Sequence, residues 1–341
     1  MSDPGGVRKK GRRFWLLAPY VILLILAAGY AGFWVFSQNR LLASLDARAD
    51  AMRQAGYSVD IEGRRVDGFP FRLRLTLPRA EIASPAGWSI AAPGLEAQAY
   101  LHSPGHWVAI APQGLTVRRP RGGLLTVKGE SMRASLVGVG GDAWRGAAEG
   151  VKLVFTPATG AAPFSLASAD RMDLNVKPGA SDAVLMLLRL QGGKAGAGAL
   201  LHRIAGEAPV TGVFDLKATQ AKAFVGGSFG EAAKAWATAD GQLQIVKAEL
   251  QAGDAAAWAK SGQLSAGRDG RLVGAVPLEL RQAPKSIGAL SGQPLDPMAA
   301  KTAAEIATAR TQGDSASLNL VFQAGVATLG PVPIGPAPKV F

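Results

Sequence analysis

The stretch GFPFRLRLTL, residues 68–77, decides the fold class of this chain. Every second residue in it is apolar, and this set is Phe69, Phe71, Leu73, Leu75 and Leu77. Arg72 and Arg74 lie between them. Because successive side chains of a strand point to opposite faces, the pattern predicts a β-strand with one apolar and one basic, hydrated face. Pro70 supplies no backbone donor and indicates a strand start, an edge or a bulge.

Shorter alternations of the same kind occur on both sides of this stretch. They cover residues 57–61, 95–101, 107–110, 115–117, 151–155, 172–176, 184–190 and 213–216. The 43 glycines and 21 prolines of the chain fit frequent tight turns between them. No helical pattern of useful length interrupts this half, which favours an antiparallel meander over parallel βαβ units.

Helical patterns appear only in the later part of the chain. A capping box at residues 228–231 precedes an Ala-rich helix that we expect to end near residue 240. We predict a second short helix at residues 254–260 and a third at residues 296–312. Turn dipeptides before strand patterns recur at residues 240–243, 261–264 and 269–272, and a Pro-rich tail predicts an edge strand or strap.

Residues 14–36 form 23 consecutive positions without a charged side chain. At about 1.5 Å per helical residue they span roughly 34 Å, enough for a hydrocarbon core of about 30 Å. Aromatic residues near both ends resemble interfacial belts, and these are Trp15, Tyr20, Tyr30 and Trp34. We therefore predict a transmembrane anchor. Cleavage as a signal peptide is disfavoured, because the apolar run continues past the small residues at 29–31.

The basic residues before the anchor favour a cytoplasmic N-terminus. The predicted organisation is a cytoplasmic basic tail at 1–13, a transmembrane helix at 14–36, a juxtamembrane helix at 37–56 and a periplasmic β-rich domain at 57–341. The juxtamembrane helix follows from apolar residues at three- and four-residue steps, namely Leu41, Leu45, Ala49 and Met52. We expect that face to pack on the domain.

Composition excludes several classes of function. The chain has no cysteine, which removes disulfides, thiol nucleophiles, iron–sulfur clusters and Cys-containing zinc sites. The net charge of +12 is dispersed after the basic tail, so we expect no nucleic-acid partner. Basic surface near a bilayer suits attraction to anionic lipid headgroups.

The sequence contains no convincing catalytic or metal site. His102 and His106 are four residues apart, but Pro104 and Gly105 between them disfavour the helix that would align them on a metal. No nucleophile elbow, His-Glu-x-x-His motif or phosphate-binding lysine loop is present. We therefore expect no catalytic residues, metal or cofactor, and a protein that is not an enzyme.

Two motifs carry a resemblance to a known family. They are Gly68-Phe69-Pro70-Phe71 and a Pro-rich segment near the C-terminus that contains Gly330, Pro331 and Pro333. With these motifs the chain resembles the alphaproteobacterial domain-of-unknown-function family 2125, single-pass envelope proteins without an established activity. The Gly-Gln/Arg-Leu strand starts are more loosely similar to AsmA-like envelope proteins. Members of that group have extended sheets curved into an apolar groove and are associated with outer-membrane lipid homeostasis.

These features predict a mainly β fold of the α+β class. We expect a long twisted antiparallel sheet or open groove with a few late helices, tethered by one N-terminal transmembrane helix. The implied location is the bacterial inner membrane, single-pass, with the bulk of the chain periplasmic.

Two hypotheses for function remain open. In the first, the protein binds or shelters lipid acyl chains, of phospholipid or another envelope lipid, for envelope maintenance. The groove candidates are Phe69, Phe71, Leu73, Leu75 and Leu77. In the alternative, it is a non-enzymatic membrane-tethered scaffold that docks an envelope protein partner through an exposed strand edge or its basic turns. A continuous open apolar groove favours the first hypothesis, and a closed core favours the second.

Overall fold

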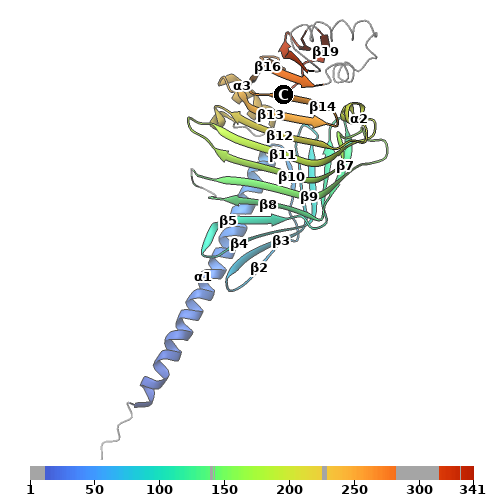
Figure 1. Cartoon of the computed structure of the whole chain (residues 1–341). Helices are drawn as coiled ribbons and strands as arrows, with labels where there is room; N and C mark the ends of the chain where they lie inside the picture. The colour runs from blue at the N-terminus through green and yellow to red at the C-terminus, as the bar shows by residue number, and fades with distance from the viewer. Residues whose placement is uncertain (1–11, 139–140, 142, 225–228, 282–314, 331) are drawn as a thin grey trace, which may run out of the picture.

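The computed structural model describes residues 12–138, 141, 143–224, 229–281, 315–330 and 332–341. A long N-terminal helix, α1 (Arg12–Gln54), leads into one large sheet in which every described pairing is antiparallel (Figure 1). Over Ala18–Gln54 the helix is long and apolar enough to cross a membrane, and no other helix in the described ranges is. The predicted fold class is therefore confirmed.

The described part of the sheet contains nineteen strands. The first ten are β1 (Ser58–Asp60), β2 (Arg65–Asp67), β3 (Arg72–Ala83), β4 (Ser89–Tyr100), β5 (Ser103–Ile110), β6 (Leu115–Arg119), β7 (Gly123–Lys128), β8 (Ser131–Val137), β9 (Arg145–Pro157) and β10 (Leu166–Pro178). The others are β11 (Val184–Ala195), β12 (Val210–Ala218), β13 (Leu243–Ala252), β14 (Ala255–Ala259), β15 (Gly262–Ala266), β16 (Leu272–Arg281), β17 (Ser315–Gln323), β18 (Val326–Leu329) and β19 (Val332–Pro336).

Strands follow one another across the sheet nearly in chain order, as a meander does. Some neighbours act as the two halves of one interrupted strand. β5 and β6 both pair with β4, and β7 and β8 both pair with β9. In the same way β14 and β15 lie together between β13 and β16. The predicted meander and the strands at the turn-dipeptide repeats are both present.

The short helices differ in part from the sequence-based expectation. The Ala-rich helix is present as α3 (Phe229–Thr238), beside the one-turn η1 (Ala221–Ala223), whereas α2 (Leu200–Ala205) was not expected. The helix predicted at residues 254–260 is wrong, because this segment forms β14 and Ala255 pairs with Ala252 across a hairpin. Pairing with β13 overrides the helical preference of its alanines. The helix predicted at residues 296–312 lies outside the described residues.

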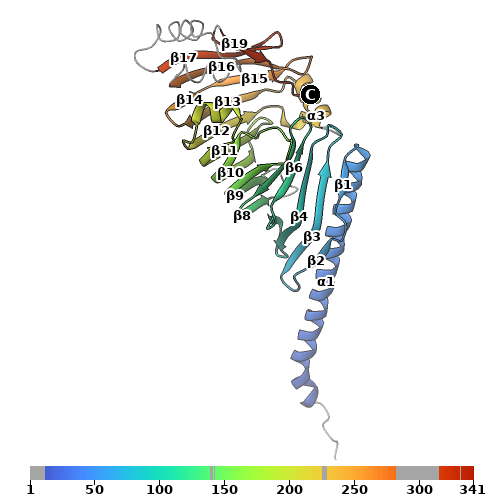
Figure 2. The same cartoon turned by 90° about the vertical axis from the view of Figure 1, so that its right-hand side faces the viewer.

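α1 is continuous through the boundary predicted at residues 36 and 37. The anchor and the juxtamembrane segment are one helix, since residues 37–39 keep helical geometry. Its C-terminal half lies along β1, β2 and β3, whereas its N-terminal half projects away from the sheet (Figures 1 and 2). Ala49 is buried, and Leu41, Leu45 and Met52 on the same face are half-buried against the domain.

The sheet curls around its apolar face because several strands bend at one level. Lys152 of β9 and Gly192 of β11 have positive φ angles of 50° and 56°. The registers of β10 with β11 and of β11 with β12 also shift near this level. Bulges of this kind bend a strand and increase its twist.

The consequence of the bend is a core shared by strands that are not neighbours. Leu125 and Val127 of β7 pack in one buried cluster with Val210 of β12 and Ala252 of β13, and Ala205 of α2 joins them. Figure 2 shows the two limbs of the curled sheet facing each other. One end of the apolar face is thereby covered.

Candidate functional site

A row of apolar residues crosses the sheet at right angles to the strands. Ten residues from β3 to β14 stand directly opposite one another in successive pairs: Leu75, Ala97, Ala109, Ala134, Ala148, Leu174, Leu188, Phe214, Ala248 and Ala259. Directly opposed residues share one face of a sheet, so these side chains form a continuous apolar line. We call this line the central row.

A second apolar row runs parallel to the first. It lies two residues away from the first row along each of its strands from β3 to β12. It contains Leu73, Ala99, Trp107, Leu136, Gly146, Val176, Met186, Leu216 and Ile245. The two rows together make the inner face of the curled sheet apolar over most of its width. Sequence reasoning found single alternating strands but missed this alignment, because it depends on register between strands.

The central row is buried at both ends, and both rows are open in the middle. Leu75 at one end of the central row is 5% exposed and Ala259 at the other is 2% exposed. Between them Leu174 is 37% exposed, and Leu136 in the second row is 40% exposed. The inner face is therefore an open apolar groove rather than a closed core.

The groove contains a hollow of about 430 Å³, within the roughly 300–1,000 Å³ usual for small-molecule sites. Apolar residues from β4, β8, β9, β10 and β11 line it, among them Leu95, Met132, Leu153, Phe155, Met172 and Leu188. Arg133, Glu149 and Asp173 border it too, but alternation along the strands directs their side chains to the opposite face. The lining suits hydrocarbon better than a charged group.

The opposite face carries ion pairs across neighbouring strands. Glu149 of β9 lies between Arg133 of β8 at 2.5 Å and Arg171 of β10 at 2.6 Å. Arg171 also contacts Asp173 at 2.9 Å. The hydrogen bond from the Arg171 guanidinium to Asp173, with the two nearby carboxylates, raises the pKa of Arg171. This face is polar and solvated, as one-sided strands require.

The groove residues predicted from residues 68–77 divide into two groups. Leu73, Leu75 and Leu77 are 4%, 5% and 7% exposed on the inner face of β3. Phe69 and Phe71 precede β3 and are 56% and 68% exposed. The expectation that all five share one strand face is therefore corrected. The turn at residues 68–71, which includes the cis Phe69–Pro70 peptide, is not strand, so the alternation begins only at Arg72.

The two aromatic residues expected near the outer end of the anchor contact this turn. The Tyr30 hydroxyl donates a hydrogen bond of 2.9 Å to the carbonyl oxygen of Pro70. The Trp34 indole is only 8% exposed, and its ring meets Phe69 edge-on with centroids 5.7 Å apart. It packs in one cluster with Leu73 and Leu101. At the other end Tyr20 is 70% exposed, and the Trp15 side chain lies outside the described residues.

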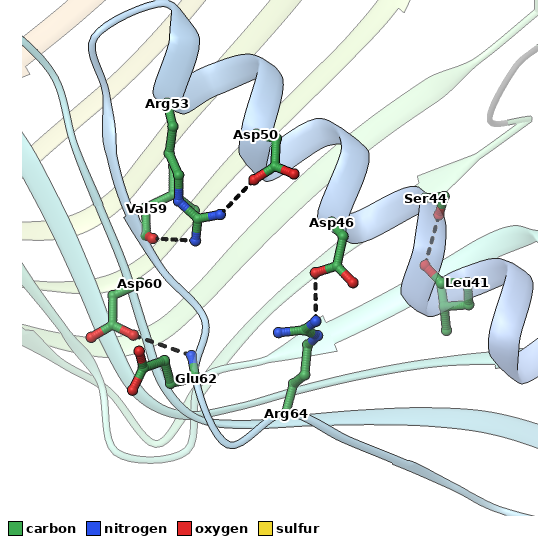
Figure 3. Close-up of polar contacts among 9 residues, drawn as sticks. All are labelled: Leu41, Ser44, Asp46, Asp50, Arg53, Val59, Asp60, Glu62 and Arg64. Atoms are coloured by element: carbon green, nitrogen blue, oxygen red, sulfur yellow. Dashed lines mark hydrogen bonds and ion pairs between the residues drawn. The ribbon is translucent and has the colours of Figure 1, made fainter.

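Polar contacts also join the C-terminal half of α1 to the start of the domain, as Figure 3 shows. Asp46 pairs with Arg64 in the loop between β1 and β2. Arg53 contacts Asp50 at 2.8 Å and donates a second hydrogen bond of 2.8 Å to the carbonyl oxygen of Val59. The helix and the first strands are thus held together by both apolar and charged contacts.

The two family motifs lie far apart in the sheet. The turn at residues 68–71 precedes β3, near one end, whereas Gly330 follows β18 and Pro333 lies in β19, at the other end (Figure 1). Gly330 has a φ of +57°, and a Cβ there would lie 2.8 Å from Leu318. Pro331 lies outside the described residues. The motifs are therefore not brought together in one site.

Neither histidine of the candidate metal pair has a ligand set around it. His102 stacks on Tyr100 with ring centroids 5.2 Å apart, and His106 lies in β5. Within the described ranges no group of three or more His, Asp or Glu side chains gathers in a way that would hold a metal ion.

The fold and its groove define a class: a protein with an apolar N-terminal helix of membrane-spanning length, joined to a curled antiparallel sheet with an apolar inner face. The chain belongs to the family described as "Uncharacterized protein conserved in bacteria (DUF2125)", which matches residues 34–338. No curated protein and no solved structure matches the chain. The looser similarity to AsmA-like proteins stays a prediction.

Proposed function

We propose that this is a single-pass membrane protein whose sheet binds or shelters lipid acyl chains along its inner face. The observation that supports this most directly is the central row, an unbroken line of apolar residues from Leu75 to Ala259 whose middle is open to solvent. Large exposed apolar surfaces on proteins mark contacts with ligands, partners or membranes.

The dimensions of the groove suit acyl chains. Ten strands at about 4.8 Å spacing give the central row a length of about 43 Å. One leaflet of a bilayer has a hydrocarbon thickness of about 15 Å, half of the roughly 30 Å core. The row is therefore longer than an acyl chain that reaches across one leaflet, so such a chain can lie within it.

The proposed setting is the bacterial inner membrane, with a cytoplasmic N-terminus and the sheet in the periplasm. The basic residues of the tail before the anchor support this orientation through the positive-inside tendency. In this setting the protein serves envelope maintenance without catalysis, and phospholipid or another envelope lipid is its ligand. The hydrocarbon lining of the groove supports binding rather than acid–base or nucleophilic chemistry.

The test uses photocrosslinking in native membranes with the full chain. A benzoylphenylalanine is placed at Leu174, in the central row, or at Asn175, the next residue and on the opposite face of β10. We expect ultraviolet light to attach lipid to the chain from position 174 and not from position 175. Intact-protein mass spectrometry identifies the adduct. Equal lipid labelling at both positions, or none at either, contradicts the proposal.

A pair of charge variants tests whether the groove itself holds the lipid. With the crosslinker at Leu188, the neighbour of Leu174 in the central row, Leu174→Glu should abolish the lipid adduct. Asn175→Glu, matched in charge and position but facing the other way, should leave it intact. Both substituted positions are already exposed, so both variants are expected to fold.

The alternative is a tethered scaffold that docks an envelope protein partner through an exposed strand edge or its basic turns. The two edges of the sheet are poor templates for a partner's strand. β19 pairs only with β18 among the described strands, but Pro333 and Pro336 remove backbone donors from it. At the other end α1 lies beside β1 and β2 (Figure 2). Protein adducts in place of lipid adducts at position 174 would support this second role.

A further inference from the structure

The turn at residues 68–71 lies beside the outer end of the apolar helix. The helix residues that contact it show its position along the helix axis. Tyr30 and Trp34, which hydrogen-bond to Pro70 and Arg72, both lie inside the apolar run of residues 14–36. Tyr30 precedes the end of that run by six residues, or about 9 Å of helix. The turn is therefore level with apolar helix, not with the polar residues that follow it.

The part of the apolar helix that precedes the turn is too short to cross a bilayer by itself. Residues 14–29, the 16 charge-free positions before Tyr30, span only about 24 Å. A hydrocarbon core of about 30 Å needs roughly 20 residues, so from Phe14 it extends to about Phe33. Arg12 and Arg13 prevent the helix from sliding further in at its other end.

The surface at this height is aromatic and exposed. Phe71 is 68% exposed, Phe69 56%, and the neighbouring helix residues Phe33 and Phe36 are 53% and 59% exposed. Tyr100, at the end of β4, is 51% exposed, and its ring lies 5.5 Å from the guanidinium carbon of Arg72. Exposed aromatic rings beside a basic side chain match the layer where hydrocarbon meets lipid headgroups.

The backbone of the turn is held firmly enough to present these rings. Arg72 donates a backbone hydrogen bond of 3.0 Å to the carbonyl oxygen of Gly68, and Leu101 donates one of 3.0 Å to that of Phe71. Gly68 has a φ of +103°, where side chains are strained. Trp34 anchors the other side of the turn through Phe69 and the Arg72 carbonyl oxygen.

We propose that this turn, with Phe69 and Phe71, inserts into the interfacial layer of the same bilayer that the N-terminal helix crosses. It would act as a second membrane contact that holds the sheet at a fixed height and orientation. The inference rests on the proposed membrane anchorage, and it does not depend on what the groove binds. Because Leu73 follows the turn and starts the second apolar row, the inner face of the sheet then begins at the lipid surface.

The chain has no cysteine, so single thiols can report on depth. Full-length Phe71→Cys, Leu24→Cys and Asn175→Cys variants are labelled with an environment-sensitive fluorophore. They are then reconstituted into vesicles of phosphatidylcholine and phosphatidylglycerol. Position 24 is the control for the membrane span, and position 175 is the control for water. Each label is quenched separately by aqueous iodide and by lipid that carries a nitroxide near its headgroup.

We expect iodide quenching at position 71 to be several-fold weaker than at position 175, and nitroxide quenching to be several-fold stronger. If position 71 is as accessible to iodide as position 175 while position 24 is protected, the turn is not inserted although the anchor is. If position 24 is also accessible, the anchorage itself fails. Thermal unfolding of each labelled variant verifies its fold, and Phe69→Cys repeats the test at the neighbouring ring.

Discussion

The indole Nε1 of Trp34 donates a hydrogen bond of 2.9 Å to the carbonyl oxygen of Arg72. It joins the apolar helix to the first residue of β3, 38 positions later in the chain. The indole ring is buried against Leu73 and Leu101, so hydrocarbon packing and a hydrogen bond act at the same place. The C-terminal half of α1 is therefore packed into the domain, whereas the N-terminal half projects away from it (Figures 1 and 2).

Removing this indole should destabilise the whole domain. We expect Trp34→Ala to lower the free energy of unfolding by about 3–5 kcal/mol, because it leaves a cavity and takes the donor from the Arg72 carbonyl. Thermal unfolding of the full chain in detergent, followed by circular dichroism, measures the effect. Phe33→Ala is the matched control, since Phe33 is the preceding residue and is 53% exposed. Similar changes in both variants would show that the helix does not depend on this contact.

The glycine of the turn at residues 68–71 offers a second test. Gly68→Ala should destabilise the protein by about 1–3 kcal/mol through backbone strain. A steric clash should add to this cost, because the new Cβ would lie 3.0 Å from the Arg72 carbonyl oxygen. Gly160 also has a positive φ, of +77°, but no atom lies within 4 Å of the position of its Cβ. Chemical denaturation should rank Gly68→Ala as more harmful than Gly160→Ala. The reverse order would contradict the close approach at Gly68.

The openness of the groove predicts unequal effects for two leucines. Leu329 of β18 is 1% exposed and packs in a buried cluster with Leu280 and Leu318, so Leu329→Ala should cost about 2–5 kcal/mol of stability. Leu174 is 37% exposed in the central row, so Leu174→Ala should cost less than about 1 kcal/mol. Urea denaturation of both variants distinguishes them. A cost for Leu174→Ala as large as that for Leu329→Ala would falsify the open groove, because it would indicate a packed core.

Glu279 of β16 should contribute stability that acid removes. The Trp258 indole donates a hydrogen bond to its carboxylate, and this bond, followed by attraction to Lys260, lowers the pKa of Glu279 from its ordinary value of 4.5. A carboxyl with a depressed folded-state pKa stabilises the fold above its unfolded pKa, and this contribution is lost as pH falls through the folded value.

We therefore expect the wild type to melt above Glu279→Gln at neutral pH, with the difference shrinking once the pH drops below about 4.5. Melting temperatures of both proteins at a series of pH values give this difference directly. A difference that stays constant from neutral to strongly acidic pH would show that the Trp258 contact does not depend on the charge of Glu279.

Local pattern was enough to predict most elements of this fold. The alternation at Leu73, Leu75 and Leu77 predicts the inner face of β3, and the apolar run at residues 14–36 predicts a helix of membrane-spanning length. Both patterns depend on residues that are near neighbours in the chain, so they are visible without a structure. The segment that forms β14 shows the limit, because its alanines suit a helix and only pairing with β13 makes them strand.

The candidate site could not be predicted from local pattern, because it depends on contacts between residues that are far apart in the chain. The central row exists because ten strands pair in one register, and no single strand contains that information. The curl around it comes from bulges near Lys152 and Gly192 that shift the alternation in mid-strand. Exposure of Phe69 and Phe71 depends on a turn that packs against Trp34.

The sequence by itself therefore determined most of the strands, the helix that is apolar enough to cross a membrane, and the apolar face of strands with a clear alternation such as β3. Those properties follow from side-chain spacing of two or about 3.6 residues within one segment. The tertiary structure alone decided that the apolar faces align into one groove, that the groove stays open, and that the helix packs on β3. Register, curvature and burial are set by contacts between segments. The spacing of residues within one segment does not reveal those contacts.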